Sequence, residues 1–180
     1  MRVLALGLLV IGLAANGSAQ SAGDSAALPR DIDPRSFSRL PLLKRDDMKT
    51  EDDKRIYDML AGGEGKTVGA TGPAPISLYS PQAAEAIQML NQYLRFHGVL
   101  KPRDYEVAIL VAAREFDQQY EWSAHEMGAR RLNVPDAVID AIKYNKPAEG
   151  ISDRDLLILT FARESLHQHR ISSELYAKTV

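Results

Sequence analysis

The spacing of apolar residues is the feature that most constrains how this chain can fold. No segment alternates between apolar and polar residues with a period of two, and β-branched residues do not cluster. Apolar residues instead recur three or four positions apart, as at Ile87, Leu90 and Leu94. A period near 3.6 is typical of helices that bury one face, whereas a period of two is typical of strands. The sequence therefore predicts an all-α fold.

The N-terminus has the composition of a secretory leader. Arg2 gives a positive start, residues 3–15 are apolar or small, and Gly17-Ser18-Ala19 supplies small residues for a signal peptidase. So short an apolar run does not comfortably span a bilayer. We therefore predict a signal peptide over residues 1–19, cleavage near Ala19, export to the periplasm or beyond, and no stable membrane insertion. A retained anchor is the alternative.

Composition excludes several classes of function. The chain carries 22 basic and 24 acidic residues, and this formal net charge of −2 gives no electrostatic reason to expect nucleic acid as a partner. It contains no cysteine. Disulfides, thiolate metal ligands and cysteine nucleophiles are therefore excluded.

Local signals predict where the helices begin and end. Residues 20–37 are rich in Ser, Ala, Asp and Pro without a period, and we interpret them as an extended or disordered N-terminal arm. Residues 38–180 are predicted to form one helical domain. Capping residues or prolines indicate helix starts at Thr50, Ser80, Lys101, Pro135, Ser152 and Ile171, with a Gly/Pro-rich loop over 62–75, a stop at Gly98 and a last helix that runs to Val180.

Glu121 and His125 form the pattern that most resembles a functional site. Four positions apart on a helix, their side chains lie one turn apart on the same face, and Gln118 is expected to join that face. A carboxylate and an imidazole presented together are the minimal parts for proton transfer near neutral pH. Tyr120 and Trp122 are expected to be pocket wall or core. An exposed ion pair on a helix surface is the plain alternative.

The same two residues also have the chemistry of metal ligands, since imidazole and carboxylate suit zinc or iron. A third ligand would be required, and only Glu106 or His97 is a candidate to approach them in the fold. His167 and His169 point to different faces near a predicted helix end, which favours a structural role. We therefore predict no metal and no cofactor.

Three stretches carry a resemblance to a known family: Arg39-Leu40-Pro41, the helix from Glu106 to Arg114, and residues 120–129 with their Tyr-Glu-Trp-x-x-His string. Together they resemble the carboxymuconolactone decarboxylase family, which shares its fold with the alkylhydroperoxidase D proteins. The similarity runs from about Ser38 to Val180 and is strongest between Leu94 and Ile142. The resemblance implies an alkylhydroperoxidase D-like helical bundle.

One departure from the family pattern bears directly on function. In the peroxidase branch, a Glu on one helix is followed by Cys-x-x-Cys at the start of the next helix and by a His four residues later. Glu106 and His125 match the Glu and the His, but Gln118 and Glu121 stand at the cysteine positions. Disulfide exchange needs a thiolate. The resemblance therefore implies the fold without peroxidase or peroxiredoxin chemistry.

The resemblance also changes the expected helix boundaries. No Gly or Pro interrupts residues 103–127, so the pattern alone predicts one long helix, in which Glu106 and His125 would lie roughly 28 Å apart. The family implies a turn near Phe116 to Gln118 that folds the chain back and brings the two together. It further implies assembly as a homotrimer or homohexamer and a longer final helix, so we expect the last helix to be truncated.

The predicted function is that of a cofactor-free enzyme acting on a small organic acid, lactone or related carbonyl compound, by decarboxylation or a lyase- or isomerase-type proton shift. His125 is the expected general acid/base, Glu106 orients it, and Glu121 is a second proton carrier or positions the substrate. The expected substrate-binding residues are Gln118, Tyr120 and Trp122. Peroxide reduction, as in the fold relatives, and a non-catalytic binding role are the alternatives.

Overall fold

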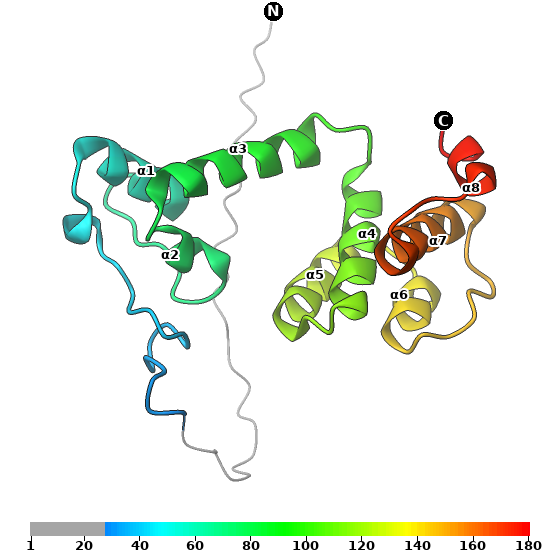
Figure 1. Ribbon diagram of the computed structural model, residues 1–180, viewed down its shortest axis with the longest axis horizontal. Helices are drawn as coiled ribbons and strands as arrows, with labels where there is room; N and C mark the ends of the chain where they lie inside the picture. Colours follow the sequence, from blue (N-terminus) through cyan, green and yellow to red (C-terminus); the bar gives the residue numbers. More distant parts are fainter. Residues whose placement is uncertain (1–27) are drawn as a thin grey trace, which may run out of the picture. The chain divides into compact units, whose positions relative to one another are not determined.

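The regular structure of residues 28–180, which the computed structural model describes, is helical (Figure 1). Within that range there is no strand, and one isolated antiparallel bridge joins Asp33 to Ser38. This confirms the all-α prediction. The predicted signal peptide (1–19) and the first part of the predicted arm (20–27) lie outside the described residues.

The chain divides into two units, and the predicted domain over residues 38–180 includes parts of both. The first unit, which ends at Ile87, contains η1 (Arg45–Asp47), α1 (Glu51–Ala61), α2 (Pro73–Ser77) and the start of α3 (Pro81–Phe96). Thr50 caps α1 as predicted, since its hydroxyl accepts the N–H of Asp53 at 3.0 Å. The predicted loop over 62–75 was too long, because proline suits the first turn of a helix and α2 begins at Pro73.

Apolar and polar contacts together hold the first unit. Met48, Tyr57 and Leu78 form its small buried core. Arg55 donates hydrogen bonds to both carboxylate oxygens of Glu85, at 2.8 and 3.0 Å, and so ties α1 to the start of α3.

The second unit begins at Gln88 and carries the candidate site. It contains the rest of α3, α4 (Pro102–Glu115), α5 (Gln119–Arg131), α6 (Asp136–Lys143), α7 (Asp153–Gln168) and α8 (Ser173–Ala177). The last helix ends before the predicted Val180. In this unit α4 contacts α5, α6 and α7 and is therefore its central helix (Figure 1). None of the helices within residues 28–180 has both the length and the apolar character needed to cross a membrane.

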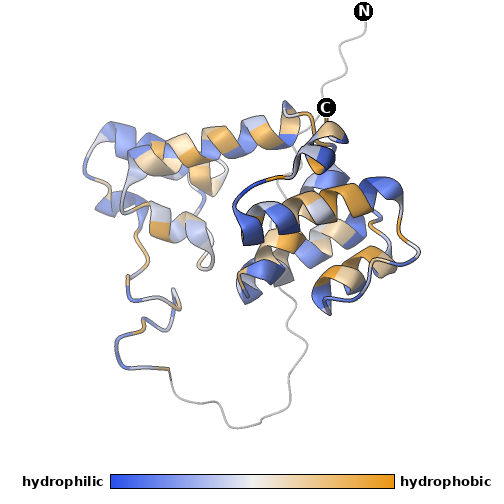
Figure 2. Ribbon diagram, turned by 45° about the vertical axis from the view of Figure 1, so that its right-hand side comes forward, coloured by the Kyte–Doolittle hydropathy of each residue, from blue (hydrophilic) through white to orange (hydrophobic). Residues whose placement is uncertain are grey.

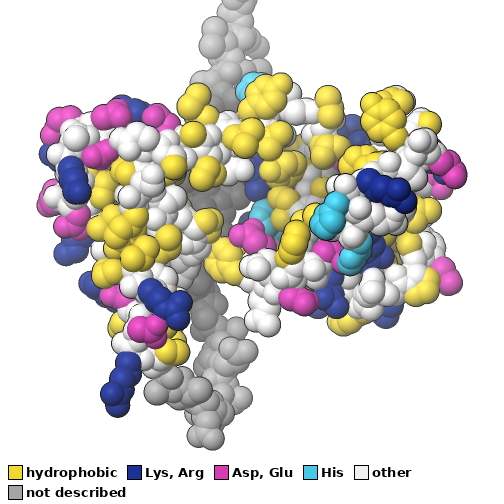
Figure 3. Space-filling model, viewed as in Figure 1, with side chains coloured by type: hydrophobic (Ala, Val, Ile, Leu, Met, Phe, Trp, Pro, Cys, Tyr) yellow, Lys and Arg dark blue, Asp and Glu magenta, His cyan; other side chains and the backbone are white. Residues whose placement is uncertain are grey.

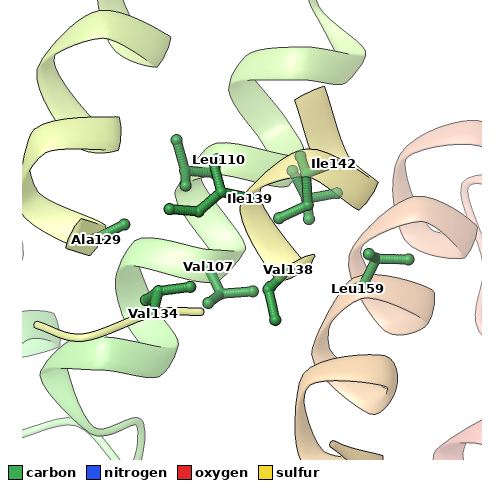
Figure 4. Close-up of a cluster of buried hydrophobic side chains, with 9 residues drawn as sticks. Val107, Leu110, Ala129, Val134, Val138, Ile139, Ile142 and Leu159 are labelled. Atoms are coloured by element: carbon green, nitrogen blue, oxygen red, sulfur yellow. The ribbon is translucent and has the colours of Figure 1, made fainter. Parts of the chain in front are cut away.

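Buried aliphatic side chains form the core of the second unit (Figure 4). Val107, Leu110 and Val111 of α4 are fully buried, as are Ile139 and Ile142 of α6. Each such side chain contributes about 1.5–3 kcal/mol relative to an exposed one. The middle of α4 is therefore held in the core, which fixes the helix that carries Glu106.

Two buried carboxylates fix the start of α4 against the start of α7. Arg103 donates to both oxygens of Asp155, at 2.6 and 2.9 Å, and Arg154 donates twice to Asp104, at 2.8 and 2.6 Å. The Arg103 guanidinium holds the pKa of Asp155 below its ordinary value, with a further contribution from the hydroxyl of Ser152 and against the opposing effect of burial. This reciprocal pairing sets the position of α4.

Candidate active site

The turn between α4 and α5 decides which of their residues can meet. α4 ends at Glu115 and α5 begins at Gln119, so the turn implied by the family resemblance is present. Asp117 adopts a left-handed conformation with φ of 51°, which aspartate tolerates better than most residues. The N–H of Gln118 then donates to the carbonyl of Ala113 at 2.8 Å, as in a Schellman C-cap. The two helices therefore fold back on each other instead of forming one rod.

This fold-back places Glu106 of α4 against His125 of α5. Glu106 Oε2 lies 2.7 Å from His125 Nδ1, and the two side chains are 8% and 17% exposed. An ionised carboxylate accepts a hydrogen bond from Nδ1–H, so a neutral imidazole in this position carries its proton on Nδ1 and presents the lone pair of Nε2. The geometry is that of a buried acid that orients a base.

A third charged group of the site, Arg95 near the end of α3, is absent from the residues predicted from the sequence. Its Nη1 lies 3.3 Å from Glu106 Oε1, and its guanidinium lies over the ring of Tyr105, 4.9 Å from the centroid. The guanidinium offsets the charge of the buried carboxylate. A buried carboxylate without such a partner would be strongly destabilising. Helical spacing gave no signal for this pair because the break at Gly98 separates the two helices.

Gly128 allows α5 to approach Glu106 closely. A Cβ atom at this position would lie 3.0 Å from Glu106 Oε2 and 3.2 Å from its carboxyl carbon. Both separations are shorter than the optimum for non-bonded contact. Because glycine inside a helix is about 1 kcal/mol less favourable than alanine, the chain gives up helix stability here to keep the two helices close.

Glu121 lies on the other side of the imidazole. Its Oε2 is 3.4 Å from His125 Nε2, one turn along α5, and its side chain is 42% exposed. This separation is longer than a good hydrogen bond to nitrogen, so Glu121 is a nearby but loosely held neighbour of Nε2. The structure therefore brings together the three predicted catalytic residues, Glu106, Glu121 and His125.

The three predicted substrate-binding residues lie at the beginning of α5. Gln118 is the N-cap residue of α5, with φ of −83° and ψ of 88°, and so precedes the regular helix. Tyr120 is exposed. Trp122 donates a hydrogen bond from Nε1 to Glu126 at 2.6 Å.

Gln118 and Trp122 line a separate cavity of about 440 Å³, beside Arg114 and Lys143. The pKa of Glu126, which borders this region, is lowered chiefly by its hydrogen bond from Arg130 and then by those from Trp122 and Lys143. The two cations of the cavity wall are thus each paired with a carboxylate, Arg114 with Asp117 at 2.7 Å and Lys143 with Glu126 at 3.3 Å.

The remaining histidines have other contacts. His97 stacks on Tyr93 with ring centroids 6.1 Å apart, and His167 Nε2 lies 2.5 Å from a carboxylate oxygen of Glu115. His169 ends α7 in a left-handed conformation. Among residues 28–180, no group of three or more His, Cys, Asp or Glu side chains has an arrangement that could hold a metal ion.

Comparison with known proteins does not identify a relative of this chain. No family model matches the chain, and no curated protein and no solved structure is significantly similar to it. The resemblance to the carboxymuconolactone decarboxylase family therefore stays a prediction from the quoted motifs.

Proposed function

We propose that this protein is a cofactor-free acid–base enzyme of the carboxymuconolactone decarboxylase type, acting on a small organic acid, lactone or related carbonyl compound. The observation that carries the proposal is the 2.7 Å separation of Glu106 Oε2 and His125 Nδ1 across the fold-back of α4 and α5. An oriented imidazole is the commonest general acid/base in enzymes near neutral pH.

In the proposed reaction, Nε2 of His125 takes a proton from the carbon next to the substrate carbonyl. The resulting imidazolium still donates a hydrogen bond from Nδ1–H to Glu106. The negative charge of this carboxylate stabilises the new positive charge on the ring. In an isomerisation the same proton then returns to another carbon. In a decarboxylation no proton is first removed from carbon: the substrate carboxylate leaves as carbon dioxide, its bonding electron pair forms an enolate with the neighbouring carbonyl, and protonated His125 donates a proton from Nε2 to the carbon that has lost the carboxylate. Glu121, beside Nε2, carries a proton or positions the substrate.

Two further parts of the proposal come from the sequence. Export after cleavage near Ala19 follows from the composition of the leader, and assembly as a homotrimer or homohexamer follows from the family resemblance. Peroxide reduction is not part of the proposal, because it needs a thiolate and the chain has no cysteine.

The proposal is tested by hydrogen exchange, which detects proton abstraction even without net turnover. Purified protein is incubated in deuterium oxide with a panel of small unsaturated lactones, keto acids and β-keto acids, and deuterium at carbon is followed by NMR while carbon dioxide is measured. Wild-type protein is expected to accelerate exchange or decarboxylation of at least one compound.

The variants His125→Ala and Glu106→Gln assign the chemistry to the site. Removal of a general acid/base typically lowers rates by 10²–10⁴-fold, so His125→Ala should lose about that much. The matched control is His167→Ala, which removes another histidine paired with a glutamate at 2.5 Å. Equal activity of His125→Ala and wild type would refute the proposed role of His125. Binding of panel compounds without any reaction would refute the catalytic proposal and would favour a binding role.

A further inference from the structure

A second cavity, of about 720 Å³, is lined mainly by α4, α7 and the segment that contains α8. All of its lining residues follow Gln88 in the chain, so the cavity belongs to the second unit alone. On α4 it is lined by Ala108 and Ala112, which lie roughly 200–240° around the helix axis from Glu106. The cavity therefore lies on the other side of α4 from the pair formed by Glu106 and His125. We call it the α4–α7 groove, and its volume is that of a small-molecule site.

One stripe of α7 forms the long wall of the α4–α7 groove. Leu157, Phe161 and Ser165 recur every four positions and so share one face of the helix. With Arg154, three positions before Leu157, the stripe extends over roughly 16 Å of α7. Figure 2 shows the hydrophobic residues of α7 between its polar ends. The wall is therefore mostly apolar and is about as long as an extended dodecyl chain.

The groove is hollow because α4 presents small side chains to it. Ala108 and Ala112 stand one turn apart, and both are only partly buried although α4 is the central helix of the unit. Larger side chains at these positions would fill the space beside them. At the surface, Tyr176 lines the groove and is 58% exposed, and Figure 3 shows hydrophobic side chains around α8. An accessible apolar hollow of this kind marks a binding site.

The charged residues of the groove have a single sign. Among residues 28–180, Arg154 and Lys178 line it and no acidic residue does, although the whole chain has more acidic than basic residues. Arg154 is held by the buried Asp104 through Nε and Nη2. Lys178 lies 3.0 Å from Glu174, and these two side chains are 61% and 85% exposed. Since an exposed ion pair is weak, Lys178 is the cation that can exchange its partner for the carboxylate of a ligand.

We propose that the α4–α7 groove binds an aliphatic monocarboxylate, such as a free fatty acid, with its hydrocarbon chain along the α7 stripe and its carboxylate paired with Lys178. The chain is buried against Leu157, Ile158 and Phe161, and each methylene group removed from water adds to the affinity. The ammonium group donates a charge-assisted hydrogen bond to the carboxylate and so selects an anion over a cationic head group. This site is separate from the acid–base chemistry proposed for His125, and neither proposal depends on the other.

Calorimetric titration of the full chain with sodium dodecanoate, below the concentration at which it forms micelles, tests the proposal. We expect saturable binding of dodecanoate and no detectable binding of acetate. Decanoate should bind about tenfold more weakly than dodecanoate, because fewer methylene groups lie on the apolar stripe. Dodecyltrimethylammonium has the same chain with the opposite charge and should bind more weakly than dodecanoate. Equal or tighter binding of this cation, or no binding of dodecanoate, would overturn the proposal.

Two variants assign the binding to the groove. Ala112→Leu should abolish dodecanoate binding because the larger side chain occupies the cavity, and its matched control is Ala137→Leu at an exposed position of α6 outside the groove. Lys178→Gln should lower the affinity for dodecanoate about fivefold, whereas Lys146→Gln, at an exposed position outside the groove, should leave it unchanged.

Urea unfolding shows whether Ala112→Leu is folded, and Lys178→Gln keeps the test decisive if it is not, because Lys178 is an exposed residue. Unchanged affinity for dodecanoate in a folded Ala112→Leu or in Lys178→Gln would overturn the proposal. Flotation of the protein with phosphatidylcholine vesicles, without saturable binding of dodecanoate, would assign the groove to a membrane surface and would also overturn it.

Discussion

Gly128→Ala should lower the activity of the candidate site while it changes the unfolding free energy of the protein only slightly. The new methyl carbon would lie 3.0 Å from Glu106 Oε2, which already accepts the 2.7 Å hydrogen bond from His125. Ordinary contact needs about 3.5 Å, so the carboxylate must move by roughly 0.5 Å. Glu106 is buried, and a shift of that size lengthens its bond to the imidazole beyond 3 Å.

The expected change in unfolding free energy is small because two effects oppose each other. Alanine is favoured over glycine in a helix interior by about 1 kcal/mol. Weakening the hydrogen bond of the buried Glu106 carboxylate to His125 lowers the unfolding free energy by about 1–3 kcal/mol. We therefore expect Gly128→Ala to be destabilised by no more than about 2 kcal/mol in urea unfolding, while proton exchange on an accepted substrate falls at least tenfold.

Ring-nitrogen NMR of ¹⁵N-histidine protein reports on the hydrogen bond itself, with the His125 signals assigned by their loss in His125→Ala. In wild type at a pH where the ring is neutral, Nδ1 should carry the proton, and Gly128→Ala should shift this signal toward a mixture of tautomers. The matched control is Gly69→Ala, which adds the same methyl group where nothing lies within 4 Å. Unchanged His125 signals and exchange within twofold of wild type would refute the reasoning.

Three further predictions concern stability and are measured by urea unfolding. Asp155→Asn should cost about 3 kcal/mol at pH 7, because Arg103 is left without its buried partner. Since the pKa of Asp155 is lower in the folded than in the unfolded state, the ion pair stabilises above the unfolded value of about 3.9 and is lost as pH falls through the folded value. The difference in unfolding free energy between Asp155→Asn and wild type should therefore become smaller below about pH 4. A difference that does not change with pH would contradict this prediction. Leu110→Ala in the buried core should cost about 2–5 kcal/mol. Thr50→Ala should cost about 1 kcal/mol through the lost cap, and no measurable loss would show that the cap bond does not contribute.

Most helix starts were predictable because their signals are local. Thr50 and Ser152 each accept the N–H of the residue three positions later, and Lys101 and Pro135 stand immediately before helices in the structure. A cap needs only its own neighbours along the chain, so the sequence contains the whole interaction.

The turn at Asp117 was not predictable from local pattern. It contains no Gly or Pro, and the left-handed conformation of Asp117 costs little enough that an ordinary helical sequence accommodates it. The family resemblance supplied what the periodicity lacked. The contact of Arg95 with Glu106 depends on the positions of two helices in space, so no spacing rule could have predicted it.

Arg95 links the end of α3 to the candidate site. Its guanidinium contacts one oxygen of Glu106 and His125 contacts the other. A movement of this end of α3 would therefore change the distance between Arg95 and the carboxylate. The position of α3 therefore bears directly on the geometry of the pair formed by Glu106 and His125.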